Sequence, residues 1–224
     1  MFSAAFFLLF SLCSRSQHLS QITFANASTL SWFSFSTDQN ILIRIGEDGK
    51  VLEWGTELAS ERSANYFAPK LQPYLGRVSY YGTEADSVSR GKLKSIGTCV
   101  FTYFGAYEVD EKRGKLKSVG SVMLDYYTRF ENLALKGKLR SAGAVSLEYY
   151  SNFENEAVRG KLKSVGGVPI SYNSTFDDKL IRGKIKSIGT VAYNWGTSLD
   201  IRYAGSLKSG SYRQNINGIT YILR

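Results

Sequence analysis

The feature that most constrains this chain is an eight-residue segment that recurs at a strict period of 23 residues. It occupies residues 90–97, 113–120, 136–143, 159–166 and 182–189, with no insertion between copies. Each copy reads Arg/Lys-Gly-Lys-Leu/Ile-Lys/Arg-Ser and ends on glycine two residues later. A strict period of this length predicts identical structural units that stack side by side and align equivalent residues into columns.

Within each unit, apolar residues alternate with polar ones. In the clearest copy Val122, Leu124 and Tyr126 share one parity, and Leu116 stands between two lysines. A period of two indicates β-strands, and a glycine such as Gly120 is typical of the tight bend between two strands. We therefore expect an all-β fold, an elongated, twisted antiparallel meander of tandem two-stranded hairpin repeats, with a loop between repeats.

The first residues of the chain have the pattern of a signal peptide, predicted here as residues 1–16. The apolar run over residues 1–12 is too short to span a bilayer, and small residues at positions 14 and 16 predict cleavage before Gln17. A lipoprotein modified at Cys13 is the alternative. The protein is thus expected to be secreted, periplasmic or at the cell surface.

Two further regions follow. Residues 17–73 are predicted to form an N-terminal β-hairpin module and linker, because Asp48 and Gly49 stand between two alternating segments. Residues 74–224 form the repeat domain, with five 23-residue repeats at 90–204 and degenerate repeats as caps. The apolar face of the repeats must be covered, either by curling of the sheet or by the N-terminal segment folding across it.

The composition narrows the chemistry of the protein. The formal charge of +9 favours binding to polyanions. His18 is the only histidine, and Cys99 is the only cysteine after the predicted leader. These counts argue against histidine-dependent nucleophiles, an intramolecular disulfide and a thiolate metal cluster. We expect no enzyme activity, no cofactor and no bound metal.

A basic ladder flanks the leucine position of every repeat and is the leading candidate for binding an anion. Its members are Lys92, Lys94, Lys115, Lys117, Lys138, Arg140, Lys161, Lys163, Lys184 and Lys186. Equivalent residues should lie roughly 10 Å apart, which is twice the spacing of strands. The competing interpretation is a solvated face that keeps the sheet soluble. An acidic row would then neutralise part of the ladder: Glu108, Glu131, Glu154, Asp177 and Asp200.

Aromatic residues also recur at fixed positions. The parity they share with valine and leucine predicts core packing for two rows: Tyr103, Tyr126, Tyr149, Tyr172 and Trp195, and Tyr107, Phe130, Phe153 and Phe176. The neighbouring Phe104, Tyr127 and Tyr150 have the opposite parity. We predict that these three rings lie on the other face and contact a partner.

The repeat resembles those of uncharacterised exported bacterial proteins whose units carry a Tyr-Tyr, Phe-Asp/Glu, Gly-Lys pattern, seen here in residues 147–166. It is more distantly similar to MORN repeats, which share the 23-residue length, the paired aromatics and a glycine seven residues later, as in Phe153 to Gly160. Leucine or isoleucine replaces the second MORN glycine. The resemblance implies one hairpin per repeat, a scaffold or surface-binding role, and no catalysis.

The sequence thus predicts a non-enzymatic exported or surface protein that binds an anionic partner through a basic strand face. Polysaccharide, lipopolysaccharide and phospholipid headgroups at a membrane surface are the candidate partners, and a specific nucleic acid is not expected. The alternative is a structural or protein–protein interaction scaffold that assembles through its sheet edges with itself or with another envelope protein.

Overall fold

The computed structural model describes residues 17–57 and 70–224. Within them the chain forms nineteen strands and no helix, so the described part contains no helix that could cross a membrane. The predicted all-β meander of hairpin repeats is confirmed. The predicted signal peptide, residues 1–16, lies outside the described residues, as do residues 58–69 of the predicted linker.

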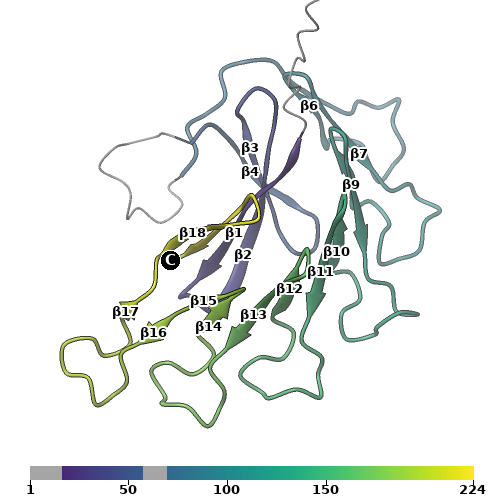
Figure 1. The fold of residues 1–224 in the computed structure, drawn as a ribbon. Helices are drawn as coiled ribbons and strands as arrows, with labels where there is room; N and C mark the ends of the chain where they lie inside the picture. Colours follow the sequence, from purple (N-terminus) through teal and green to yellow (C-terminus); the bar gives the residue numbers. More distant parts are fainter. Residues whose placement is uncertain (1–16, 58–69) are drawn as a thin grey trace, which may run out of the picture.

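Eleven strands form one antiparallel sheet, here called the repeat sheet, in which every strand pairs with its neighbours in the chain (Figure 1). They are β5 (Val78–Tyr80), β6 (Leu93–Ile96), β7 (Cys99–Tyr103), β8 (Leu116–Val119), β9 (Val122–Tyr126), β10 (Leu139–Ala142), β11 (Val145–Tyr149), β12 (Leu162–Val165), β13 (Val168–Tyr172), β14 (Ile185–Ile188) and β15 (Val191–Ala192). Next along the chain come β16 (Asn194–Trp195) and β17 (Leu207–Ser209), which pair with each other.

The two strands of a repeat are joined by a two-residue turn. In the β8–β9 hairpin Val119 pairs with Val122, and Gly120 at the first turn position has φ 56°. A positive φ at this position is what a type II′ hairpin requires. The glycine that recurs every 23 residues is therefore needed for its backbone conformation.

A β-bulge in the first strand of each repeat alters the predicted alternation. Thr102 pairs with Ser118 and Tyr103 pairs with Leu116, so Lys117 is an extra residue in β8. As a result Leu116 and Val119 are both fully buried although three positions separate them. The same shift occurs at β6, β10, β12 and β14. Each bulge therefore points one basic residue out of the sheet.

The two ends of the chain build a second sheet, here called the terminal sheet. Its strands run in the order β18 (Arg213–Ile216), β19 (Ile219–Leu223), β1 (His18–Ala25), β2 (Thr29–Ser36), β3 (Leu42–Ile45) and β4 (Val51–Gly55). Strand β1 pairs with β19 in parallel, and the other pairs are antiparallel. The sheet thus takes strands from both sides of the predicted boundary at residue 74.

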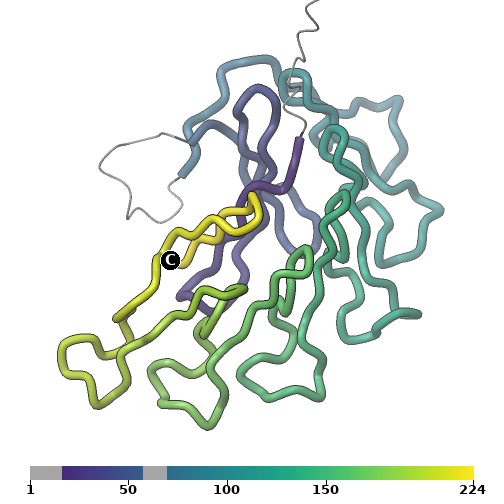
Figure 2. The backbone as a smooth tube through the Cα atoms, viewed as in Figure 1, coloured from purple at the N-terminus to yellow at the C-terminus, as the bar shows by residue number. Residues whose placement is uncertain are grey.

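The terminal sheet covers the apolar face of the repeat sheet. Residues of both sheets belong to one buried cluster, and the backbone N–H groups of Leu139 and Ile185 donate to the carbonyls of Glu47 and Ala27 at 2.7 and 2.8 Å. Figure 2 shows the purple and yellow chain ends side by side within the arc of teal and green hairpins. Sequence analysis left two ways to cover the apolar face of the repeat sheet. In the structure the N-terminal segment covers it, together with β18 and β19 from the C-terminal end of the chain.

The leucine position of the repeats forms the continuous buried column that the period predicts. Its members are Leu93, Leu116, Leu139, Leu162 and Ile185, and each is at most 5% exposed. Burying a leucine side chain stabilises the fold by about 1.5–3 kcal/mol. This column fixes which flanking residues lie at the boundary between the two sheets.

Candidate functional site

The structure divides the predicted basic ladder into two rows with different environments. The residue before the leucine position lies at the boundary between the sheets, and the residue after it lies in the bulge. We call the first row the inter-repeat lysines: Lys92, Lys115, Lys138, Lys161 and Lys184. We call the second row the bulge cations: Lys94, Lys117, Arg140, Lys163 and Lys186.

Each inter-repeat lysine connects its repeat to the next one. Its Nζ donates to the carbonyl of a glycine at the base of the following loop, as in Lys138 to Gly160 at 2.8 Å and Lys161 to Gly183 at 2.6 Å. Lys92, Lys115 and Lys184 make the equivalent bonds to Gly114, Gly137 and Gly205. The same ammonium groups lie 4.7–5.0 Å from the ring centres of Tyr103, Tyr126, Tyr149, Tyr172 and Trp195.

Partial burial changes the titration of four inter-repeat lysines. It lowers the pKa of Lys161 to about 8, and it lowers the pKa values of Lys92, Lys115 and Lys184. The cause is loss of hydration, which disfavours the charged form. This half of the ladder contributes to the fold, because each ammonium group bonds to a glycine carbonyl of the next repeat and faces an aromatic ring.

The bulge cations have a more open environment. Lys94, Arg140, Lys163 and Lys186 are exposed and Lys117 is half-buried. Arg140 pairs with Glu131 and, at 3.6 Å, with Asp125. Among the described residues, the four lysines of this row make no ion pair.

Small polar side chains surround the bulge cations on the outer face of the repeat sheet. A serine follows each cation: Ser95, Ser118, Ser141, Ser164 and Ser187. These serines bond across the strands, as in Ser79 to Ser95 at 2.7 Å and Ser171 to Ser187 at 2.6 Å. The outer face also carries the exposed Met123 and the carboxylate of Glu148, which accepts from Ser164. The ammonium groups of Lys94, Lys117 and Lys163 lie 5.6–5.7 Å from the ring centres of Tyr81, Phe104 and Tyr150.

The predicted acidic row neutralises the ladder only in part, because its carboxylates also act within the loops. Glu131 accepts from the backbone N–H of Thr128 at 3.0 Å, and Asp200 accepts from that of Thr197 at 2.8 Å. The bond from Thr128 lowers the pKa of Glu131. In the described chain, this row forms ion pairs with two basic residues, Arg140 and Lys208.

The first aromatic row packs in the core as predicted. Tyr126, Tyr149, Tyr172 and Trp195 are at most 7% exposed, and Tyr103 is half-buried. Their polar atoms donate to carbonyls of the leucine column, as in Tyr126 to Leu116 at 2.7 Å. The equivalent bonds start from Tyr103, Tyr149, Tyr172 and Trp195.

Phe104, Tyr127 and Tyr150, predicted to lie on the outer face and to contact a partner, are less exposed than that prediction requires. Phe104 is 9% exposed, and the other two rings are half-buried. Phe104 packs edge-on against Tyr126 at 6.2 Å, and the other two make the same contact with the tyrosine of the next repeat. Strand β9 ends at Tyr126, so parity no longer places the following residue.

The prediction that Tyr107, Phe130, Phe153 and Phe176 are core residues is wrong. They are 104%, 83%, 101% and 95% exposed. These residues lie in the loops between repeats, beyond the strand ends, where alternation has no meaning. They form an exposed apolar row along the loop tips, which Leu199 continues at 91% exposure.

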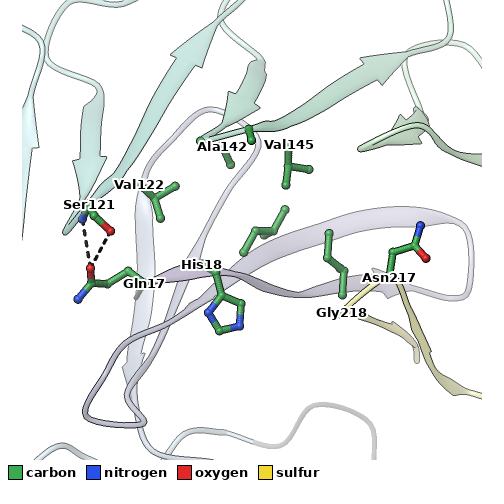
Figure 3. A pocket seen from close by; sticks show the side chains of 12 residues that line it. Gln17, His18, Ser121, Val122, Ala142, Val145, Asn217 and Gly218 are labelled. Atoms are coloured by element: carbon green, nitrogen blue, oxygen red, sulfur yellow. Dashed lines mark hydrogen bonds between the residues drawn. The ribbon is translucent and has the colours of Figure 1, made fainter. Parts of the chain in front are cut away.

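Two of the cavities that described residues line lie where the sheets meet. The smaller, about 430 Å³, is next to the start of β1 (Figure 3). There Gln17 Oε1 accepts hydrogen bonds from the backbone N–H and Oγ of Ser121 at 3.2 and 3.0 Å. His18 is at its edge, and Val122 and Val145 contribute apolar wall. These valines are small and apolar, so this wall offers few groups that could orient a polar ligand.

The larger cavity, about 650 Å³, lies between the β3–β4 turn and the first repeats. Its lining includes Trp54 and Tyr103 together with the inter-repeat lysines Lys92 and Lys115. Sequence analysis could not identify it, because its two walls are far apart in the chain. Within the described residues, no three His, Cys, Asp or Glu side chains gather as a metal site requires.

Comparison of the chain with protein-family models, curated proteins and solved structures found no match. The resemblance to exported repeat proteins and to MORN repeats therefore stays a prediction.

Proposed function

We propose that the outer face of the repeat sheet binds a linear polyanion, an acidic polysaccharide, through the bulge cations. The observation that carries this proposal is the row of one basic side chain per repeat on the outer face, four of them exposed and Lys117 half-buried. Two strands separate successive cations, so their spacing is roughly 10 Å. An extended polymer that crosses the strands would meet each of them in turn.

Regular spacing makes a polymer a better partner than a single small anion. Each exposed ion pair contributes only about 0–1 kcal/mol, so useful affinity requires several at once. At physiological salt the Debye length is about 8 Å. Cations at this spacing therefore repel one another weakly, and the row can stay charged before the polymer arrives.

The proposal includes the exported, non-enzymatic character that the sequence predicts. An acidic polysaccharide is a common component outside the membrane, where the predicted signal peptide would deliver the chain. Phospholipid headgroups offer the same charge but present it as a plane. The single row of bulge cations suits a chain better than a plane.

The test is retention on heparin, a sulfated polysaccharide, at low salt. We expect the purified protein to bind and to elute as salt rises. The variant K94S/K117S/K163S/K186S should elute at markedly lower salt, while K70S/K136S/K179S/R202S removes the same number of charges from other exposed positions and should elute near the wild type. No retention, or equal losses in the two variants, would refute the proposal. Binding to anionic vesicles but not to heparin would favour lipid.

Assembly through sheet edges, the alternative from the sequence, has less support. The outermost strands of the repeat sheet, β5 and β15, have three and two residues. At the edge of the terminal sheet, Thr56 next to β4 is paired with Gln72. Short or covered edges offer few free backbone groups to another chain.

A further inference from the structure

The larger cavity of about 650 Å³ lies where the terminal sheet and the repeat sheet diverge. The β3–β4 turn supplies Asp48, β4 supplies Trp54, and β5 supplies Tyr80. The repeat sheet, to which β5 belongs, also contributes Lys92, Tyr103 and Lys115. This volume is within the range of about 300–1,000 Å³ that is usual for small-molecule sites.

The inter-repeat lysines differ in how many partners they have. Lys138 also contacts Glu47 at 2.9 Å, and Lys161 also contacts Ser28 Oγ at 2.7 Å, both from the terminal sheet. For Lys92 and Lys115, the described residues provide one hydrogen-bond acceptor each, a glycine carbonyl. An ammonium group has three donors. Each ammonium group also lies 4.9 Å from a ring centre, that of Tyr103 or Tyr126. With one donor on the carbonyl and one toward the ring, one donor of each lysine remains for a ligand.

The charges around the cavity are not balanced. Asp48 is the one acidic residue in its lining, and it already pairs with Lys50 at 3.0 Å. Arg113, also in the lining, pairs with Asp110 at 2.8 Å. Burial lowers the pKa values of Lys92 and Lys115, although Asp48 and Glu111 act on Lys115 in the opposite direction. An anion would compensate both ammonium groups.

Aromatic side chains in the lining of the cavity indicate what kind of group would accompany the anion. Trp54 and Tyr103 are half-buried and Tyr80 is 54% exposed. Aromatic faces pack against the C–H faces of sugar rings, and the carboxylate of Asp48 can accept from hydroxyl groups. A purely apolar ligand would leave these polar groups without water or partners, which is costly.

We propose that this cavity binds an acidic oligosaccharide of about two sugar units, with one carboxylate at Lys92, another at Lys115 and a ring against Trp54. The two lysines are equivalent residues of successive repeats, so they lie roughly 10 Å apart, too far for one carboxylate to reach both. This site is separate from the outer face and does not depend on the function proposed for it.

Calorimetric titration with digalacturonate tests the proposal. We expect binding, with galacturonate about tenfold weaker because it reaches one lysine. Lys92→Gln and Lys115→Gln should each weaken digalacturonate binding about tenfold, which is the loss of one charge-assisted hydrogen bond. Lys184→Gln is the matched control, since Lys184 makes the same bond to a glycine and the same ring contact outside this cavity. It should bind like the wild type.

Several outcomes would overturn the site. They are no heat at millimolar digalacturonate, equal binding of uncharged cellobiose or of the ring-free adipate, or an equal loss in Lys184→Gln. If a lysine variant fails to fold, Trp54→Leu tests the site instead. The proposal requires this variant to weaken digalacturonate binding, and the substitution does not change the charge of the protein. The quadruple bulge variant should still bind digalacturonate, so the two proposals can fail separately.

Discussion

A half-buried lysine with several partners is the most informative residue of this fold. The ammonium group of Lys161 lies 2.6 Å from the carbonyl of Gly183, 2.7 Å from Ser28 Oγ and 5.0 Å from the ring of Tyr172. It thereby links two repeats and the terminal sheet. Lys163, two positions later, is exposed on the other side of the strand. The same residue type is thus packed within the fold at one position and exposed to solvent at the other.

This difference predicts unequal costs for two lysine substitutions. Lys161→Ala should lower the free energy of unfolding by about 1.5–3 kcal/mol, since it removes a charge-assisted bond and leaves acceptors unpaired. Lys163→Ala should change it by less than about 0.5 kcal/mol. Urea titrations followed by tryptophan fluorescence measure both. Equal effects would contradict the division of the ladder into two rows.

Buried tyrosines predict a loss of stability at high pH. Burial raises the pKa values of Tyr103 and Tyr221 to about 12, against 10.0 for the unfolded side chain. Between these values the unfolded state has released its protons and the folded state has not, so unfolding becomes easier as pH rises. The stability that these two tyrosines contribute is fully present below pH 10, the pKa of the unfolded side chain. Denaturation midpoints measured from pH 9 to 12 should fall steadily.

Tyr221→Phe provides the control for that pH series. The hydroxyl of Tyr221 is buried and has no hydrogen-bond partner among the described residues. Its removal costs no bond and eliminates one titrating group, so the variant should keep its stability at neutral pH and show a shallower decline. A slope equal to that of the wild type would exclude Tyr221 as a contributor.

At the scale of elements, each repeat combines a rigid hairpin with an exposed loop. The hairpin carries the leucine column and the bulge cation, and the loop carries an apolar residue at its tip. An apolar side chain that recurs at a fully exposed position contributes nothing to the core. The loop tips are therefore a second regular surface, on a different part of each repeat from the bulge cations.

Two substitutions separate the loop from the hairpin. Phe153→Ser should change the free energy of unfolding by less than about 0.5 kcal/mol, because the ring is fully exposed. Leu162→Ala removes a side chain that is 1% exposed and should cost about 2–5 kcal/mol. Thermal unfolding by circular dichroism compares them. A large loss of stability in Phe153→Ser would contradict the exposed position and support the sequence prediction that this ring packs in the core.

At the scale of the molecule, the repeats depend on the chain ends. In an open repeat array each unit contacts only its neighbours. Here Glu47 and Ala27 bond to particular repeats, at Leu139 and Ile185, and β1 pairs with β19. We therefore expect that a repeat could be added or removed only if the terminal sheet changed in size as well.

A chain of residues 70–224 should therefore not fold on its own. Without β1 to β4, the leucine column and the neighbouring rings lose their cover, and such a large apolar surface favours association. We expect aggregation or a species that binds an apolar dye, with no cooperative transition in calorimetry. A soluble monomer with cooperative unfolding would show that the repeat sheet is stable alone. The full-length protein is the reference.

The strict period and the alternation were enough to predict the hairpins, the turn glycines and the buried leucine column, because strand pairing in this sheet involves neighbours in sequence. The wrong prediction, at Phe153, extended strand parity past a strand end. Sequence alone offered no signal for the bulge at Lys163 either, since a bulge is defined by the partner strand.

What the sequence by itself determined is the repeating unit: its length, its two strands and its columns of like residues. Tertiary structure alone decided which lysines are buried, how the apolar face is covered and where a cavity opens. The physical reason is that hydrogen bonds within a repeat are local and recur with the period. Burial depends instead on the terminal sheet, whose strands come from the distant ends of the chain and carry no repeat.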